Sequence, residues 1–186
     1  MRVISGLFKG KKLFEPKDIK TRPLKDLTKE SIFNIILHSN KFNLDFSNAN
    51  ILDMFAGVGS FGIECLSRGA KYVVFAENYN GVLPILKKNL KNLKSTQNFN
   101  ILEKNIYDEN FFSDLNNLYD IIFLDPPYKD KKINEILLNI IDSKILNQKG
   151  IIIIHRHKNE KDEFPSKIKI IEEKKYGISK INFLSM

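Results

Sequence analysis

Short apolar runs, each about as long as a β-strand, recur along most of this chain and alternate with segments of helical pattern. From residue 51 onward these runs are continuous, which is typical of strands that are buried on both faces of a sheet. Helices between consecutive strands allow those strands to lie parallel. The expected strands are residues 51–55, 72–76, 99–104, 119–124 and 150–155, and the expected helices are 60–67, 81–94 and 131–141. The pattern predicts an α/β fold with a doubly wound, Rossmann-like sheet that is mostly parallel.

Both ends of the chain depart from this alternation. Residues 2–14 alternate roughly and contain Gly6 and Gly10, which predicts a small N-terminal β-arm, and residues 24–40 carry a helical apolar stripe. Residues 167–171 and 179–184 predict a C-terminal antiparallel hairpin that closes the sheet. We therefore expect an N-terminal extension over residues 1–48 and a main domain over residues 49–186.

Composition narrows the class of protein further. A chain of 186 residues suits one core, and 42% hydrophobic residues suffice to fill it. Uninterrupted apolar runs such as residues 151–154 are far shorter than the ~20 residues of a membrane span, and the first ten residues lack the apolar stretch of a secretory signal. The single cysteine, Cys65, cannot form an intramolecular disulfide and fits a reducing compartment. We expect a cytoplasmic protein that does not engage membranes.

The charge of the chain is positive and unevenly distributed. The formal net charge is +8, and residues 1–50 carry 10 basic against 5 acidic residues, whereas residues 101–150 carry 6 against 9. A localised basic patch is expected of a protein that binds a phosphate backbone. A lysine-rich solvated surface explains the same numbers, so charge alone leaves both interpretations open.

A glycine-rich turn follows the first expected strand. Gly57, Gly59 and Gly62 have the G-x-G-x-x-G spacing, and Glu77 follows Gly57 by twenty residues at the end of the second expected strand. In nucleotide-binding sheets such glycines permit a tight turn, and such an acid holds ribose hydroxyls. Asp53, at the end of the first strand, would repel a dinucleotide pyrophosphate but would complement the positive charges of S-adenosylmethionine. The turn therefore predicts a site for S-adenosylmethionine in preference to NAD.

The loop after the fourth expected strand carries the strongest chemical signal. It reads Asp125-Pro126-Pro127-Tyr128 and lies at the carboxyl edge of the sheet, where open α/β proteins bind ligands. Prolines lack a backbone N–H, so this loop offers acceptors: the carboxylate of Asp125 and a neighbouring carbonyl. Two acceptors can hold the hydrogens of an exocyclic amine on a nucleobase and aim its lone pair at an electrophilic methyl group. Tyr128 would stack on the base.

These motifs resemble a known family. Asp53 with its glycine turn and residues 125–128 resemble the class I S-adenosylmethionine-dependent amino-methyltransferases. Residues 1–13, 21–23, 30–34 and 52–70, with Tyr176-Gly177, resemble more narrowly the bacterial 16S rRNA (guanine(966)-N(2))-methyltransferases, and this resemblance spans essentially the whole chain.

The resemblance implies which residues would act. Asp125, Pro126, Pro127 and Tyr128 match the catalytic loop, and Asp53, Gly57, Gly59 and Glu77 match cofactor-binding positions. We also expect Phe55 and Asn105 to contact the cofactor. Phe55 also suits a core position. This chain departs from the family at two places: it has Asn78-Tyr79 where a second acid usually follows Glu77, and Asn105 where an acid commonly receives the adenine amino group. The amide oxygen of Asn105 can still accept a hydrogen bond.

The resemblance also implies an RNA partner: 16S rRNA, free or within an assembled or assembling small ribosomal subunit. A guanine N2 inside stacked RNA is inaccessible, so we expect the base to be extruded into the pocket. The N-terminal arm would contact phosphates without reading sequence. The expected RNA-binding residues are Arg2, Lys9, Lys11, Lys12 and Arg22. We expect a monomer and no bound metal.

Several alternatives remain open on sequence grounds. DNA adenine-N6 and cytosine-N4 methyltransferases share the acid-Pro-Pro-aromatic loop, although 186 residues leave little room for a target-recognition domain. Glutamine-modifying protein methyltransferases resemble this chain except that they have Asn-Pro-Pro-Tyr, and a non-catalytic RNA-binding assembly factor or a nicotinamide oxidoreductase would be further readings. Phe61 and Cys65 suit a core, and the three histidines, His38, His155 and His157, lack metal-ligand spacing and receive no predicted role.

Overall fold

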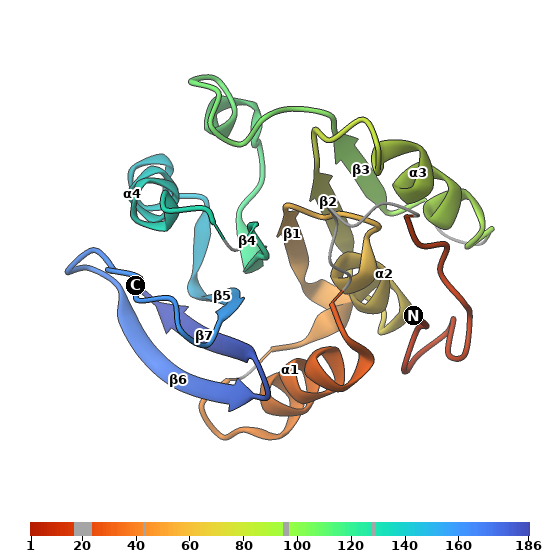
Figure 1. The fold of residues 1–186 in the computed structure, drawn as a ribbon, viewed down its shortest axis with the longest axis horizontal. Helices are drawn as coiled ribbons and strands as arrows, with labels where there is room; N and C mark the ends of the chain where they lie inside the picture. The colour runs from red at the N-terminus through yellow and green to blue at the C-terminus, as the bar shows by residue number, and fades with distance from the viewer. Residues whose placement is uncertain (17–23, 43, 95–96, 128) are drawn as a thin grey trace.

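The computed structural model describes the chain except for residues 17–23, 43, 95–96 and 128. A seven-stranded sheet with the order β3-β2-β1-β4-β5-β7-β6 forms its centre (Figure 1). The strands are β1 (Asn50–Met54), β2 (Tyr72–Ala76), β3 (Phe99–Leu102), β4 (Tyr119–Leu124), β5 (Leu146–His157), β6 (Lys169–Tyr176) and β7 (Ser179–Ser185). The helices are α1 (Asp26–His38), α2 (Ser60–Ser67), α3 (Leu83–Lys91) and α4 (Ile133–Ser143), with 3₁₀ turns η1 (Phe46–Asn48) and η2 (Phe112–Asp114). The predicted α/β, mostly parallel fold is confirmed.

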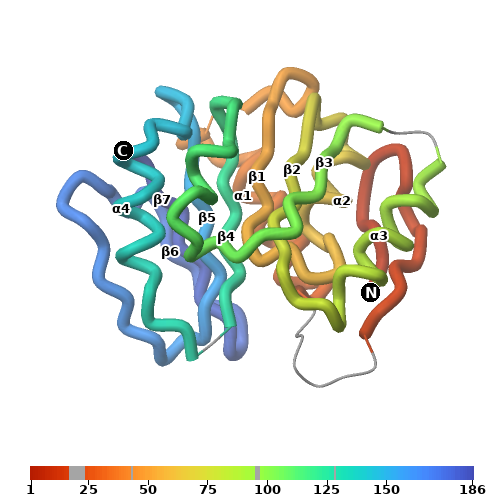
Figure 2. Tube along the Cα trace, turned by 90° about the horizontal axis from the view of Figure 1, so that it is seen from above, coloured from red at the N-terminus to blue at the C-terminus, as the bar shows by residue number. Residues whose placement is uncertain are grey.

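Each face of the sheet has its own hydrophobic core, which explains the continuous apolar runs. In β1, Ile51 packs on the side of α1, α2 and α3, while Leu52 packs on the side of α4 and η2. The other central strands alternate in the same way, so that every residue of a strand such as 51–54 is buried. Figures 1 and 2 show the three N-terminal helices on one side of the sheet and α4 on the other.

The strand order reverses direction between β1 and β4, which pair in parallel with Asp53 opposite Phe123. At such a reversal the connections leave the sheet on opposite faces, and a crevice opens at the carboxyl ends of the strands. Asp53, Glu77 and Asp125 lie in or directly after β1, β2 and β4, and therefore come to this same edge.

The C-terminal hairpin is confirmed, and it is longer than predicted. β7 pairs antiparallel with both β5 and β6, and Gly177 makes the connecting turn with φ of +59°. The expected strand at residues 150–155 extends to Leu146–His157 because pairing with β7 and β4 continues it beyond the apolar run. Residues of β6 are mostly exposed and polar, so no apolar pattern marked their pairing.

The N-terminal β-arm is reduced to one antiparallel bridge, between Arg2 and Lys12, so the predicted hairpin is only partly correct. The arm instead follows the surface of α2: its backbone N–H groups at residues 4 and 5 donate to the carboxylate of Glu64, at 2.8 and 2.9 Å. Val3, Phe8 and Leu13 enter the same core as α1. Within the described part of the chain, no helix is long and apolar enough to cross a membrane. The functional division at residues 48/49 stays a prediction.

Candidate active site

A cavity of about 780 Å³ opens at the carboxyl edge of the sheet, where the predicted chemistry should lie. It brings together eight of the predicted site residues: Asp53, Phe55, Gly57, Glu77, Asn105, Asp125, Pro126 and Pro127. Gly59 does not line it, and Tyr128 lies outside the described residues. Its wall also includes residues from the N-terminal part and from the β6–β7 turn, among them Leu24, Lys25, Ile178 and Ser179.

The glycine turn between β1 and α2 is built from left-handed backbone. Phe55, Gly57 and Gly59 have φ of +60°, +57° and +83°. Glycine adopts these angles easily, whereas a bulky residue such as Phe55 pays a conformational cost of about 1–2 kcal/mol. Phe55 is half-buried and lines the cavity, so it does not belong to the core interior. Gly59 has a packing role instead: a Cβ there would lie 2.6 Å from Cδ1 of Leu86.

Asp53 is buried beneath this turn. Its Oδ2 accepts the backbone N–H of Gly62 at 2.9 Å, in the first turn of α2. Burial raises the pKa of Asp53 well above its ordinary value, the hydrogen bond from Gly62 lowers it, and the negative charges of Asp125 and Glu77 raise it further. The site thus concentrates negative charge that a cation would relieve.

Glu77 joins the end of β2 to the glycine turn. Its Oε2 accepts the N–H of Gly57 at 2.8 Å, and its Oε1 accepts the N–H groups of Asn78 and Tyr79 at 2.9 and 2.8 Å. These three bonds fix the carboxylate at the cavity wall. A carboxylate has about four acceptor sites, so one site on Oε2 is left, to which a ribose hydroxyl can donate.

The loop after β4 is held by a buried arginine of β5. Arg156 is fully buried and donates to the carbonyls of Pro127 and Asp130, at 3.3 and 2.6 Å, while Asp162 pairs with it at 3.0 Å. The carbonyl of Pro127 also accepts the N–H of Asp130 at 2.8 Å. The carbonyl of Pro127 is therefore already engaged, and the carbonyl of Pro126 remains as the neighbouring acceptor expected beside Asp125.

A histidine that received no predicted role lies at the centre of the site. Nδ1 of His155 is 2.8 Å from Oδ1 of Asp125, and its Nε2 is 2.9 Å from Oγ of Ser179. All three residues line the cavity. His155 stands one residue beyond the Leu124–Ile154 pair of the β4–β5 ladder, so it lies opposite Asp125. Its place at the end of an apolar strand, as for Asp53 and Asp125, was the available sequence signal.

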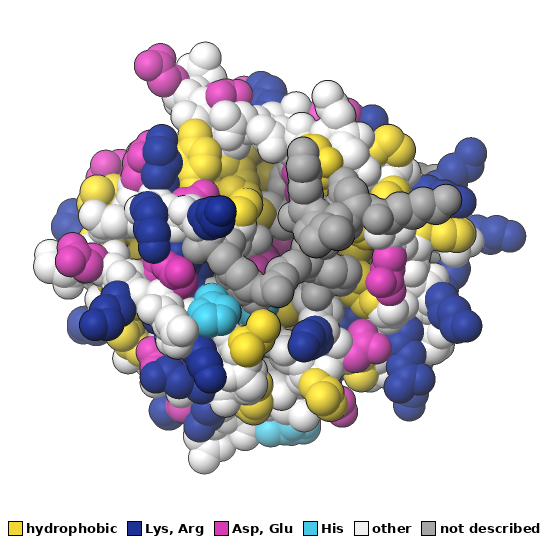
Figure 3. All heavy atoms as spheres, viewed as in Figure 1, with side chains coloured by type: hydrophobic (Ala, Val, Ile, Leu, Met, Phe, Trp, Pro, Cys, Tyr) yellow, Lys and Arg dark blue, Asp and Glu magenta, His cyan; other side chains and the backbone are white. Residues whose placement is uncertain are grey.

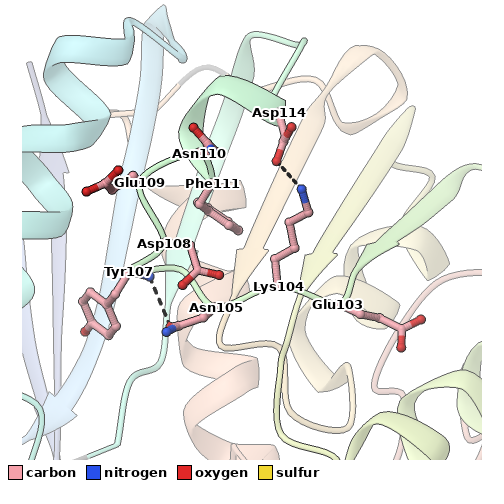
Figure 4. Close-up of a pocket in the computed structure, with 9 residues that line it drawn as sticks. All are labelled: Glu103, Lys104, Asn105, Tyr107, Asp108, Glu109, Asn110, Phe111 and Asp114. Carbon is pink, nitrogen blue, oxygen red and sulfur yellow. Dashed lines mark hydrogen bonds and ion pairs between the residues drawn. The ribbon is translucent and has the colours of Figure 1, made fainter.

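The opposite end of the cavity meets a second hollow of about 580 Å³, and the two share Asn105 and Tyr107 (Figure 4). Oδ1 of Asn105 accepts the backbone N–H of Tyr107 at 3.2 Å. The hydroxyl of Tyr107 donates to Asp130, and burial together with this bond raises the pKa of Tyr107. One lone pair of the Asn105 oxygen is thus already engaged, which leaves one for a ligand.

Among the predicted RNA-binding residues that the structure describes, Arg2 and Lys11 already have partners within the protein. Nε of Arg2 lies 3.8 Å from Asp26, and Nζ of Lys11 donates to the carbonyl of Asn92. Lys9 and Lys12 are exposed, and Arg22 lies outside the described residues. On the face in Figure 3, Lys and Arg side chains lie at both the left and the right edges and do not gather in one place. Two exposed lysines absent from the prediction, Lys25 and Lys129, line the cavity itself.

The chain is similar to a family model, to named proteins and to solved structures. A family model described as conserved hypothetical protein 95 matches residues 1–185. "Putative rRNA methyltransferase YlbH" of Bacillus subtilis is 33% identical over 96% of this chain and 95% of its own length. "Ribosomal RNA small subunit methyltransferase D" of Haemophilus influenzae is 32% identical over 96% and 90%. The solved structure of "Putative methyltransferase yhhF" from Escherichia coli superposes with a TM-score of 0.80 at 26% identity, over 99% of this chain and 96% of that one.

Proposed function

This chain belongs to the family described as conserved hypothetical protein 95, and on that premise we propose that it transfers a methyl group from S-adenosylmethionine to the exocyclic N2 of a guanine in 16S rRNA. The observation that carries this proposal is the meeting of Asp53, Glu77 and Asp125 in one cavity at the ends of β1, β2 and β4. Relatives that match nearly the whole chain bear names of rRNA methyltransferases, one of them of the small subunit.

The residues present fit S-adenosylmethionine. Its sulfonium and ammonium groups are cationic, and the cavity holds three carboxylates, of which Asp53 has a pKa raised by burial and by its acidic neighbours. Asp53 and the turn around Gly57 would hold the methionine part, and Glu77 would accept a ribose hydroxyl. Phe55 and Asn105 would border the rest of the cofactor. When bound, S-adenosylmethionine supplies an electrophilic methyl group.

Asp125 is the catalytic residue in this proposal. Its side chain is 19% exposed at the cavity and can accept an N–H of the guanine amino group, while the carbonyl of Pro126 accepts the other. These bonds turn the nitrogen lone pair away from the aromatic ring and strengthen as positive charge develops on nitrogen. The cavity, with apolar Leu24 and Ile178 at its wall, excludes water around the base.

The target guanine must leave its stack to reach Asp125, because N2 is not accessible inside paired or stacked RNA. Lys25 and Lys129, which are exposed and line the cavity, would hold the flanking phosphates, and the exposed Lys9 and Lys12 of the arm would extend the contact. Contacts of this kind position the RNA without reading its sequence. We propose that residues 1–48 serve mainly this purpose.

The test combines binding with product analysis. Calorimetric titration should show binding of S-adenosylmethionine and none of NAD, and incubation with small ribosomal subunits or 16S rRNA should yield N2-methylguanine by mass spectrometry. Asp125→Asn should lower kcat about 100-fold or more, with cofactor Kd changed less than about threefold, since an amide cannot match a carboxylate as acceptor.

Three outcomes would contradict the proposal: tight NAD binding, methylation of adenine N6 or cytosine N4 in DNA instead of guanine N2, or full turnover by Asp125→Asn. Glu135→Gln on α4 is the matched control, because Glu135 is an exposed carboxylate outside the cavity. It should leave both binding and turnover unchanged.

A further inference from the structure

We infer that His155 is a positioning residue for Asp125. Its Nδ1–H donates to Oδ1 of the carboxylate, so that Oδ2 is left to accept the substrate amine. Ser179 contacts Nε2 on the other side of the ring and holds the ring in place. This inference rests on the proposed methyl transfer and names the group that makes Asp125 competent for it.

The geometry fixes His155 on both sides. β4 and β5 run parallel, so their carboxyl ends bring Asp125 and His155 together, with Nδ1 and Oδ1 2.8 Å apart. β7 runs antiparallel to β5 and begins at Ser179, whose Oγ is 2.9 Å from Nε2. The residue is only 6% exposed, so the ring has little freedom to swing away from this arrangement.

The hydrogen-bonding roles follow from the partners. Asp125 as a carboxylate only accepts, so Nδ1 must carry a proton and donate to it. Ser179 can donate to a bare Nε2 or accept from a protonated one. In either protonation state of the ring, Oδ1 of Asp125 stays bound to Nδ1–H.

This bond divides the work of the carboxylate. Because Oδ1 is bound to His155, Oδ2 is the oxygen available to the amino group of the base. If S-adenosylmethionine supplies the methyl group, the new N–C bond would form as the bond between that methyl carbon and the sulfonium sulfur breaks, and the sulfur would keep the electron pair as the neutral thioether S-adenosylhomocysteine. The nitrogen would then hold one proton more than in the neutral product. That proton passes to Oδ2, and the resulting carboxylic acid returns it to water after product release, so charge and protons balance.

The connectivity Ser179–His155–Asp125 matches that of a hydrolytic Ser-His-Asp triad, in which serine is the nucleophile. The exposure is reversed here: Asp125 is partly exposed at the cavity, whereas Ser179 is buried. The reactive end of this array is therefore the carboxylate. A serine-directed fluorophosphonate probe should leave the protein unlabelled, and labelling at Ser179 would overturn the inference.

Two substitutions of His155 distinguish the effect of the Nδ1–H hydrogen bond from the effect of side-chain volume. Asn places an amide nitrogen near the position of Nδ1, and Gln places one near the position of Nε2. His155→Gln, the larger of the two, should lower kcat about 100-fold while the KM for S-adenosylmethionine changes less than about threefold, in line with the loss of a group that orients a reacting residue. His155→Asn should stay within about fivefold of the wild-type kcat. Ser179→Ala should lower kcat about threefold. If only side-chain volume mattered, His155→Gln would have a higher kcat than His155→Asn, and that result would overturn the inference.

A measurement on the protein without substrate or cofactor completes the test. Nitrogen-15 NMR should show Nδ1 of His155 protonated, with a shift that moves in Asp125→Asn, whereas His38, exposed at the end of α1, should not respond. An unprotonated Nδ1 would overturn the inference even if a variant fails to fold. Absence of wild-type methyl transfer would count against the proposed function alone, since the NMR result does not depend on turnover.

Discussion

Two charged clusters contact helix α2, and they are built in opposite ways. The arm cluster consists of Lys29, Glu64 and Arg68 beneath the N-terminal arm, and the cavity cluster consists of Asp53, Glu77 and Asp125. In the arm cluster Glu64 is fully buried and meets Nζ of Lys29 at 3.5 Å and Nε of Arg68 at 2.9 Å. In the cavity cluster like charges face one another, and among the described residues these carboxylates accept hydrogen bonds from backbone N–H groups and lie against His155.

The difference indicates that the charges of the arm cluster stabilise the fold, whereas the charges of the cavity cluster are suited to binding a ligand. Burial lowers the pKa of Lys29, and the negative charges of Glu64 and Asp26 raise it. Within the arm cluster, opposite charges therefore offset part of the cost of burying the lysine. The pKa of Asp53 is raised, which means that its ionised form is held at a cost. Removing a charge should therefore destabilise the fold in the first cluster and impair binding in the second.

The largest effect on stability should come from Glu64→Gln. This change leaves Lys29 buried without its carboxylate and weakens the acceptor for two backbone N–H groups of the arm. Breaking a buried pair from one side costs about 3 kcal/mol or more of unfolding free energy. Urea denaturation would measure it, and below the transition the Kd for S-adenosylmethionine should stay within about threefold of wild type.

Glu30→Gln on α1 is the control for this prediction, because Glu30 is exposed. It should change the unfolding free energy by less than about 0.5 kcal/mol. A loss below about 1 kcal/mol in Glu64→Gln would show that the arm cluster does not hold the fold.

Asp53→Asn should show the opposite behaviour. The amide oxygen can still accept from Gly62, and the desolvated charge disappears, so the unfolding free energy at pH 7 should not fall. The Kd for S-adenosylmethionine should rise about 100-fold, equivalent to about 2.7 kcal/mol. Calorimetry and thermal denaturation measure the two quantities, and an unstable variant with unchanged affinity would reverse the comparison.

The raised pKa of Asp53 adds a pH dependence. Its neutral form is favoured in the folded protein, so its contribution to stability falls as pH rises above the ordinary value of 3.8 toward the folded-state pKa. A bound cation favours the ionised form and expels the proton, so affinity should rise with pH across that window. Titrations in buffers of different ionisation enthalpy should detect proton release in the wild type and less in Asp53→Asn; equal release in both would refute this assignment.

The smallest effect should come from the exposed lysines of the arm. Lys9→Ala with Lys12→Ala should weaken RNA binding at every sequence and reduce the slope of log K against log salt by about 1.5, since each phosphate contact contributes about 0.7–0.9. Lys71→Ala with Lys149→Ala is the matched control, because both lysines are exposed at the amino edge of the sheet. Equal slopes for the two double variants would assign the arm to solubility.

The parts of the site that could be predicted from sequence depend on local pattern. Asp53 lies near the end of a short apolar strand and Glu77 and Asp125 directly follow one, and parallel strands bring their carboxyl ends to one edge. That rule needs no knowledge of strand order.

The contacts of His155 could not be predicted in this way. They require β5 beside β4 and β7 beside β5, and the second pairing is antiparallel and reaches polar residues such as Ser179. The burial of Lys29 could not be predicted either. A lysine in an amphipathic helix is usually exposed, whereas here the N-terminal arm covers it and the carbonyl of Arg2 accepts a hydrogen bond from its Nζ. The unpredicted residues are those whose partners lie in a distant segment.

The place of β7 in the sheet has a consequence for the order of events during translation. This strand is synthesised after all the others, yet it lies between β5 and β6. Until residues 179–185 leave the ribosome, β5 has an open edge and His155 lacks Ser179. A nascent chain arrested before that point can form the β1–β4 half of the sheet but not the complete site, so folding of the core and readiness for chemistry are separated in time.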